Sequence, residues 1–286
     1  MKRFFFLIFS LFMIPLAAQS QDGFKPYFLG EDFLFYKGSL FIINPNGNSD
    51  YGHSFYASLD ECMDSYSNKV IYPSAQYSFN TERDSLLNRV FRVDDIVQDS
   101  KSSWNPKIVF LLKDTLRDDT IYFVYDKKYE HSFPFWVNEI KSFGSEYIKS
   151  KFEKRVDDFT SEVTISTPIL TNSEISPVIL YKIIKNGVAH YYISLNTTGS
   201  TVNVGEKGVI VLFTDGTKWT RQTEIDVDAS SRGFNYSAWI TLTSSDLLTF
   251  QNKTIKGFKL YIYDEYVALP VAERFKAFVK EIKSMK

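Results

Sequence analysis

The chain has 286 residues, of which 44% are hydrophobic, and 33 Lys or Arg residues nearly balance 34 Asp or Glu residues for a formal net charge of −1 at pH 7. This balance lacks the basic excess typical of nucleic-acid-binding proteins, which argues against a nucleic-acid partner. The apolar content is sufficient for a buried core, and the length suits one large domain or two of ordinary size.

The N-terminus has the pattern of a secretory signal peptide. Lys2 and Arg3 precede an almost wholly apolar run over residues 4–14, and Ala18-Gln19-Ser20 provides small residues at the cleavage site. The run is too short to span a bilayer, and no cysteine follows it that could carry a lipid anchor. We therefore expect an exported protein, periplasmic or secreted, without a membrane span or lipid anchor. Loss of Lys2 and Arg3 would leave a net charge of −3.

After a signal peptide at residues 1–20, residues 21–158 are predicted to form a β-rich module. Aromatic and aliphatic residues suggest short strands at 33–35 and 40–42, and Ser58 is a candidate cap for a short helix. The clearest signals are three β runs at residues 90–97, 108–112 and 121–125, whose spacing favours a meander. Residues 44–88 otherwise give no clear assignment.

The spacing of apolar residues then changes to that of a helix, which predicts an amphipathic helix at about residues 137–153. Its apolar positions are Val137, Ile140, Phe143, Tyr147, Ile148 and Phe152. The charged end of this helix leads into an expected linker near residues 155–161.

Residues 159–286 are predicted to form a β-sandwich-like module that ends in a helix. Two strand patterns flank Asn186-Gly187, the strongest short-range signal for a hairpin. Further strands are expected at 201–204, 208–213, 217–219, 238–242 and 258–263, with a short helix capped by Thr243 or Ser244. The last helix, near residues 271–282, is expected to pack its apolar stripe onto a sheet. The predicted fold class is therefore mainly β.

Aromatic residues make up 17% of the chain. They fit a strand-rich core, and exposed rings would instead provide contacts for a sugar or a peptide. Trp239 lies in an apolar strand and is expected in the core. Trp219 follows the Asp215-Gly216 turn beside Lys218 and Arg221, so we expect it to be partly exposed. Trp219, Lys218 and Arg221 are therefore our candidates for ligand binding.

An acidic cluster offers a second candidate site. In a single strand, Glu224, Asp226 and Asp228 would share one face, and Asp215 from the nearby turn could join them. Such carboxylates could bind Ca²⁺, could act in catalysis, or could form an ordinary solvated face. Calcium is the only cofactor that the sequence suggests.

The familiar catalytic motifs are missing from the sequence. His53, His131 and His190 have no metal-binding spacing, and no nucleophile elbow or nucleotide-binding loop occurs. Cys62 is the only cysteine, so the chain can form no internal disulfide. Flanking acidic residues would blunt its reactivity, which favours a structural role over a nucleophilic one.

One part of the chain resembles known sequences. The segments YYISLNTTGSTVNVGEKGVIVLFTDGTKW, EIDVD, FNYSAWITLT and KGFKLYIYD, within residues 191–263, resemble a C-terminal module of uncharacterised exported bacterial proteins. The resemblance implies an exported β-rich module and no particular activity.

These observations favour a non-enzymatic binding or interaction role in the bacterial envelope, with a glycan or an envelope protein as partner. An exposed aromatic ledge would support this role. A glycan hydrolase with paired carboxylates in one cleft is the first alternative. A subunit of a surface assembly, recognisable by exposed strand edges, is the second.

Overall fold

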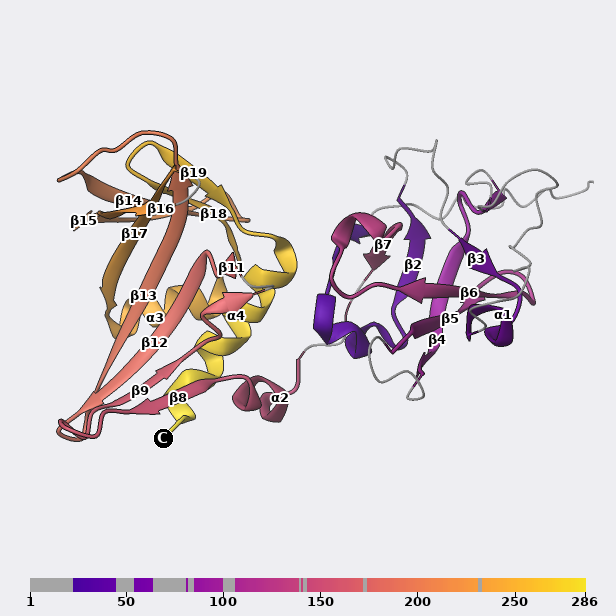
Figure 1. Cartoon of the computed structure of the whole chain (residues 1–286), viewed down its shortest axis with the longest axis horizontal. Coiled ribbons are helices and arrows are strands. Elements are labelled where there is room, and N and C mark those ends of the chain that lie inside the picture. Colours follow the sequence, from indigo (N-terminus) through magenta and orange to yellow (C-terminus); the bar gives the residue numbers. More distant parts are fainter. Residues whose placement is uncertain are drawn as a thin grey trace, which may run out of the picture. The chain divides into compact units, whose positions relative to one another are not determined.

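The computed structural model describes residues 23–44, 54–63, 81, 85–99, 106–138, 140, 143–171, 174–230 and 233–286. The predicted signal peptide, His53 and Trp104 lie outside these residues. The described chain is mainly β, as predicted, and forms two compact units (Figure 1). The described residues of the first unit fall within Met1–Pro26, Lys37–Tyr125 and Pro134–Glu139, and those of the second within Tyr27–Tyr36, Asp126–Phe133 and Ile140–Lys286.

The first unit contains a seven-stranded antiparallel sheet. In spatial order its strands are β1 (Lys25–Pro26), β7 (Phe135–Asn138), β2 (Leu40–Ile43), β4 (Val90–Gln98), β5 (Ile108–Asp114), β6 (Thr120–Tyr125) and β3 (Phe55–Tyr56). Strands β4, β5 and β6 are neighbours in chain order, which confirms the predicted meander. Helix α1 (Leu59–Met63) follows Ser58, whose hydroxyl accepts a hydrogen bond from the Glu61 amide as expected of a cap.

Aromatic packing curls this sheet. Phe123 of β6 and Phe135 of β7 are separated by three strands, yet their ring centroids lie 5.2 Å apart. A buried ion pair adds to this core, since Arg89 Nε lies 2.7 Å from an Asp114 carboxylate oxygen. The fully or nearly buried rings of this unit include those of Phe41, Phe55, Phe91, Phe110, Phe123, Tyr125 and Phe135.

The helix expected at residues 137–153 is much shorter in the structure. Helix α2 spans only Ser145–Ser150, and Val137 belongs to β7, where it pairs with both Lys25 and Phe41. The backbone of Phe135–Asn138 therefore pairs with neighbouring strands and does not form helical hydrogen bonds. Strand β8 (Glu153–Val156) begins three residues after α2, so the segment that sequence assigned to the first module contributes to the second unit.

A 3₁₀ helix, η1 (Gly30–Tyr36), replaces the strand expected around Phe33 and Phe35. The Tyr36 hydroxyl closes the segment, because it accepts from the Leu29 amide and donates to the Tyr27 carbonyl. Within the second unit, η1 also presents Asp32 to two cations of distant elements.

Asp32 is nearly buried and forms an ion pair with Arg274 at 2.7 Å, with Lys151 at 3.8 Å. Burial raises the pKa of Asp32, and the charges of Arg274 and Lys151 oppose that increase without cancelling it. The second unit therefore joins residues from near both ends of the chain.

Two antiparallel sheets form most of the second unit. The six-stranded sheet contains, in spatial order, β16 (Asp226–Ser230), β17 (Gly233–Leu242), β13 (Val188–Gly199), β12 (Val178–Lys185), β9 (Val163–Ser166) and β8. The four-stranded sheet contains β15 (Lys218–Glu224), β14 (Lys207–Phe213), β18 (Ile255–Leu260) and β19 (Tyr263–Tyr266). A further short pair joins β10 (Leu170–Thr171) and β11 (Glu174–Ile175).

Turn chemistry explains the hairpins. Asn186 and Gly187 have φ values of 50° and 77°, as the predicted tight turn between β12 and β13 requires. Tyr261 has a φ of 56° and reverses the chain between β18 and β19, so the single strand expected at 258–263 is two strands. The stretch at residues 201–204 is a loop.

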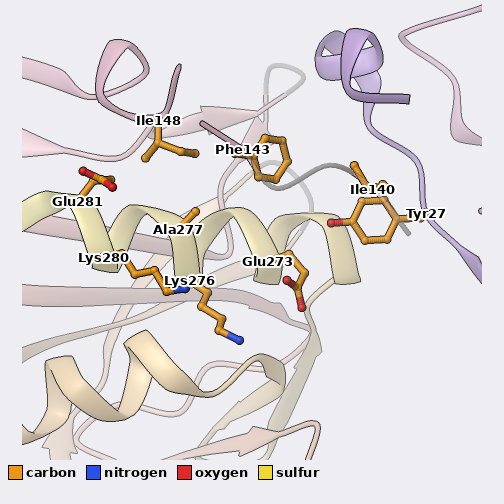
Figure 2. A pocket seen from close by; sticks show the side chains of 9 residues that line it. All are labelled: Tyr27, Ile140, Phe143, Ile148, Glu273, Lys276, Ala277, Lys280 and Glu281. Atoms are coloured by element: carbon orange, nitrogen blue, oxygen red, sulfur yellow. The ribbon is translucent and has the colours of Figure 1, made fainter. Parts of the chain in front are cut away.

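The helices of the second unit close the core between the sheets. Thr243 caps α3 (Ser244–Asn252) with a reciprocal capping box, as predicted. Helix α4 (Leu269–Glu281) buries Ala272, Phe275, Phe278 and Val279 in the same core as residues of both sheets, which confirms that its apolar stripe packs inward. A cavity lies along another side of α4 (Figure 2).

Two short 3₁₀ helices, η3 (Glu130–Ser132) and η4 (Ile282–Ser284), complete the described elements. No helix among the described residues has the length and apolar character needed to cross a membrane.

We predict that Gly199→Ala destabilises the second unit. An added Cβ would lie 2.5 Å from the Tyr263 ring and 2.7 Å from the Tyr236 ring. Tyr236 is fully buried, and its hydroxyl donates to the Thr201 carbonyl and accepts from the Asn203 amide, so the ring cannot yield cheaply. Urea unfolding should show a loss of about 1–3 kcal/mol, the usual cost of overpacking.

Gly144→Ala is the matched control, because a Cβ at this helix cap meets nothing within 4 Å. It should cost less than about 1 kcal/mol. Equal losses in the two variants would show that crowding at Gly199 is not limiting.

Candidate functional site

Trp219 is a core residue, so the expectation that it is partly exposed is wrong. Only 7% of it is accessible to solvent. Alternation along β15 directs Trp219 inward and Lys218 and Thr220 outward. The Trp219 ring packs edge to face against Phe250 of α3, with the centroids 5.1 Å apart.

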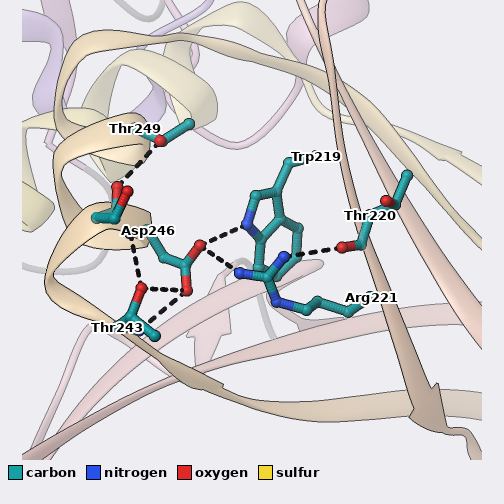
Figure 3. Close-up of polar contacts among 7 residues, drawn as sticks. Trp219, Thr220, Arg221, Thr243, Asp246 and Thr249 are labelled. Carbon is teal, nitrogen blue, oxygen red and sulfur yellow. Dashed lines mark hydrogen bonds and ion pairs between the residues drawn. The ribbon is translucent and has the colours of Figure 1, made fainter.

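The Asp246 carboxylate explains this orientation (Figure 3). One of its oxygens accepts hydrogen bonds from Trp219 Nε1 at 2.7 Å and from Arg221 Nη2 at 2.5 Å. The other oxygen accepts from the Thr243 amide at 2.9 Å and the Thr243 hydroxyl at 2.8 Å. Four donors thus converge on one buried carboxylate.

Arg221 is part of this network. Its guanidinium lies 4.4 Å from the centroid of the Trp219 ring, which it covers while donating to Asp246. Lys218 points to the opposite side of the strand and is exposed. The three residues proposed from sequence as ligand contacts therefore do not share one surface.

The network also determines the charge of Asp246. Burial alone raises the pKa of Asp246, but hydrogen bonds from Trp219, Thr243 and Arg221 together outweigh burial and hold it below its ordinary value. Asp246 is therefore ionised near neutral pH. This role is structural, since all four of its donors come from the protein itself.

The acidic residues singled out from sequence do not form one cluster. Strand β15 ends at Glu224, the buried Ile225 follows, and Asp226 begins β16 in the other sheet. The expectation of a single strand with three carboxylates on one face is therefore wrong. Glu224 pairs with Lys207 at 3.0 Å, and Asp226 and Asp228 are exposed along β16.

Asp215 is engaged within its own turn. It accepts from the Thr217 hydroxyl and amide and pairs with Lys253 at 2.9 Å, and these hydrogen bonds lower the pKa of Asp215 to about 2. Among the residues that the structure describes, no group of three or more His, Cys, Asp or Glu residues could hold a metal ion.

Trp239 is exposed, contrary to the expectation that it lies in the core. It is 44% accessible, whereas its neighbours Ala238 and Ile240 are buried. Alternation along β17 therefore places Trp239 on the outer face of the six-stranded sheet.

Two tyrosines from neighbouring strands join Trp239. The ring of Tyr181 in β12 lies 4.5 Å from that of Trp239, and the ring of Tyr192 in β13 lies 5.3 Å from it. Tyr181 and Tyr192 are direct partners in the β12–β13 register. We call Tyr181, Tyr192 and Trp239 the aromatic platform.

Hydrogen-bonding residues flank the aromatic platform in the same row of the sheet. Strand pairing aligns Glu153, Ser166, Tyr181, Tyr192 and Thr241 across five strands. Glu153 and Thr241 are exposed at the two sides of the row. The outer face thus combines flat rings at its centre with a carboxylate and a hydroxyl beside them.

The tyrosine of the central strand is a neutral donor. Burial, with a contribution from the negative charge of Glu153, raises the pKa of Tyr181. Its hydroxyl therefore keeps its proton at neutral pH.

Sequence reasoning missed the aromatic platform, although a signal was present. Every second residue of a strand points to the same face of the sheet. Three of the residues that share a face with Trp239 in β17 are polar, which is typical of an outward face: Asn235, Ser237 and Thr241. Tyr191 and Tyr192 are adjacent in β13 and lie on opposite faces of the sheet, since Tyr191 packs against the core and Tyr192 joins the platform.

The cysteine and the two described histidines do not form a shared site. Cys62 is fully buried with Tyr56 and Val109 in the first unit, in agreement with a structural role. His131 and His190 are exposed.

Comparison with protein-family models, with curated proteins and with solved structures gives no match to this chain.

We predict that Asp246→Asn lowers the free energy of unfolding by about 2–3 kcal/mol at pH 7, since it removes charge-assisted hydrogen bonds and turns an amide N–H toward donors. Because the folded-state pKa of Asp246 is lowered, its contribution is complete above the unfolded pKa of about 4 and falls as pH drops through the folded value. In urea titrations performed from pH 6 downward, the difference between wild type and variant should stay constant to about pH 4 and shrink below it.

Asp226→Asn removes an exposed carboxylate and serves as the control. It should change the unfolding free energy by less than about 0.5 kcal/mol. A constant difference between wild type and Asp246→Asn across the acid range would contradict the assigned role of the charge.

Proposed function

We propose that this protein is an exported, non-enzymatic binding protein that holds a carbohydrate on the aromatic platform. The observation that carries the proposal is the 44% exposure of Trp239 in contact with two tyrosine rings on a sheet face. Tryptophan and tyrosine are the residues most enriched where binding energy concentrates. The signal peptide predicted from the sequence, if present, would place the protein where glycans are abundant.

The chemistry of the face favours a sugar over a purely apolar ligand. The C–H side of a pyranose ring is flat and weakly apolar, and it can pack on an indole or phenol ring. Sugar hydroxyls could then donate to Glu153 and exchange hydrogen bonds with Thr241 and Tyr181, which lie in the same row. An open sheet face also leaves an extended chain room to continue on both sides.

The surface-assembly alternative has one observation in its favour. Strand β8 is an edge strand whose four residues are exposed, including Val156 at 55%. Lys154 and Arg155 lie on the same strand, and charged edge residues discourage pairing with another strand. The aromatic platform therefore gives the stronger basis for a function.

The proposal predicts that Trp239→Ala weakens glycan binding by at least about tenfold, the scale expected for truncating a central tryptophan. A panel of soluble envelope and dietary polysaccharides can be screened by tryptophan fluorescence, and any hit measured by isothermal titration calorimetry. Tyr181→Ala and Tyr192→Ala should each weaken the same ligand.

Tyr266→Ala is the matched control, since Tyr266 is 76% exposed on the other sheet. It should leave glycan affinity unchanged. Melting temperatures of all variants separate lost binding from lost folding. Failure of every glycan to bind, or a hit that survives Trp239→Ala, would exclude the platform as a sugar site.

A further inference from the structure

The cavity along α4 is a second candidate site, separate from the aromatic platform. Its volume is about 360 Å³, within the range of pockets that enclose small molecules. Helix α4 supplies one long side, and residues from α2 and from the segments that precede α2 and η1 supply the rest. All of these residues belong to the second unit.

One part of the cavity wall is apolar and well packed. Ile148 is only 1% exposed, and Phe143 packs edge to face on Phe35 at 4.8 Å. Phe143 also stacks on Tyr147. Figure 2 shows Ile148 and Phe143 on the same side of α4 as Ala277, so an apolar group has a preformed surface to contact.

Two lysine side chains line another part of the cavity wall. Lys276 and Lys280 are one turn apart on α4, and Figure 2 shows both side chains extending to the same side of the helix. Within the described part of the chain, no carboxylate forms an ion pair with either ammonium group. The two glutamates of the cavity are already engaged, because Glu281 pairs with Lys149 at 3.6 Å and Glu273 accepts from Thr254 at 3.1 Å.

Tyr27 adds a neutral donor at the other end. Burial, followed by the charge of Glu273, raises the pKa of Tyr27, so its hydroxyl keeps its proton. Figure 2 shows this hydroxyl directed toward the cavity. The cavity therefore offers two cationic donors and one neutral donor beside an apolar wall.

From this arrangement we propose that the cavity along α4 binds a small anionic amphiphile, with its apolar chain against Phe143, Ile148 and Ala277 and its carboxylate between Lys276 and Lys280. A cationic amphiphile would meet the two unpaired ammonium groups. A neutral one would gain no charge attraction from them.

The test uses isothermal titration calorimetry of the full chain with three probes of equal chain length: decanoate, decanol and decylammonium. Decanoate should bind most tightly. The double variant Lys276→Gln/Lys280→Gln should weaken decanoate about tenfold and leave decanol unchanged, since partly exposed ion pairs each contribute modestly. Lys283→Gln, an exposed lysine outside the cavity, should change neither.

Two further variants locate the site. Ala277→Phe fills the cavity and should abolish binding of decanoate and decanol alike. Lys276→Glu should reduce decanoate binding and increase decylammonium binding, a reversal that a folding defect cannot produce. The proposal is overturned if decanol binds as tightly as decanoate, if the lysine variants change nothing, if a folded Ala277→Phe still binds, or if no probe binds.

Discussion

One buried carboxylate sets the arrangement of the second unit. Asp246 receives hydrogen bonds from Trp219 and Arg221 of the four-stranded sheet and from Thr243 at the end of the six-stranded sheet. Buried charges are tolerated only when their acceptor sites are filled, so each donor must be supplied at a fixed position. The network therefore ties the two sheets together at the start of α3.

The consequences of this tie extend into both proposed sites. With its indole N–H held by Asp246, Trp219 contacts Phe250, and Phe250 in turn contacts Phe275 of α4. This chain of rings fixes the inner side of α4 and leaves another side for the cavity. Since Trp219 serves the core, the exposed tryptophan of the unit is Trp239, on the sheet face that points away from that core.

Local chemistry made part of this structure predictable. Asn186-Gly187 specifies a tight turn through its own backbone preferences, and Thr243 with Asp246 specifies a helix start within four residues. The orientations of Trp219 and Trp239 depend instead on which face of each strand meets the core. For Trp219 that choice is stabilised by a partner 27 residues away. Likewise, Val137 fits the spacing of a helix, but its backbone pairs with strands that are distant in sequence.

The ion pair between Asp32 and Arg274 bears on how the chain is made. During synthesis Asp32 emerges early, whereas Arg274 emerges only as the chain nears completion. Until then, η1 lacks the cation that pairs with Asp32, so this contact of the second unit forms only after α4 has been made. Dividing the chain at residue 158 into two separately expressed fragments would also separate η1 from α4. A fragment that preserves the second unit must keep both, so isolating it requires linkers in place of the internal segments of the first unit rather than truncation at one end.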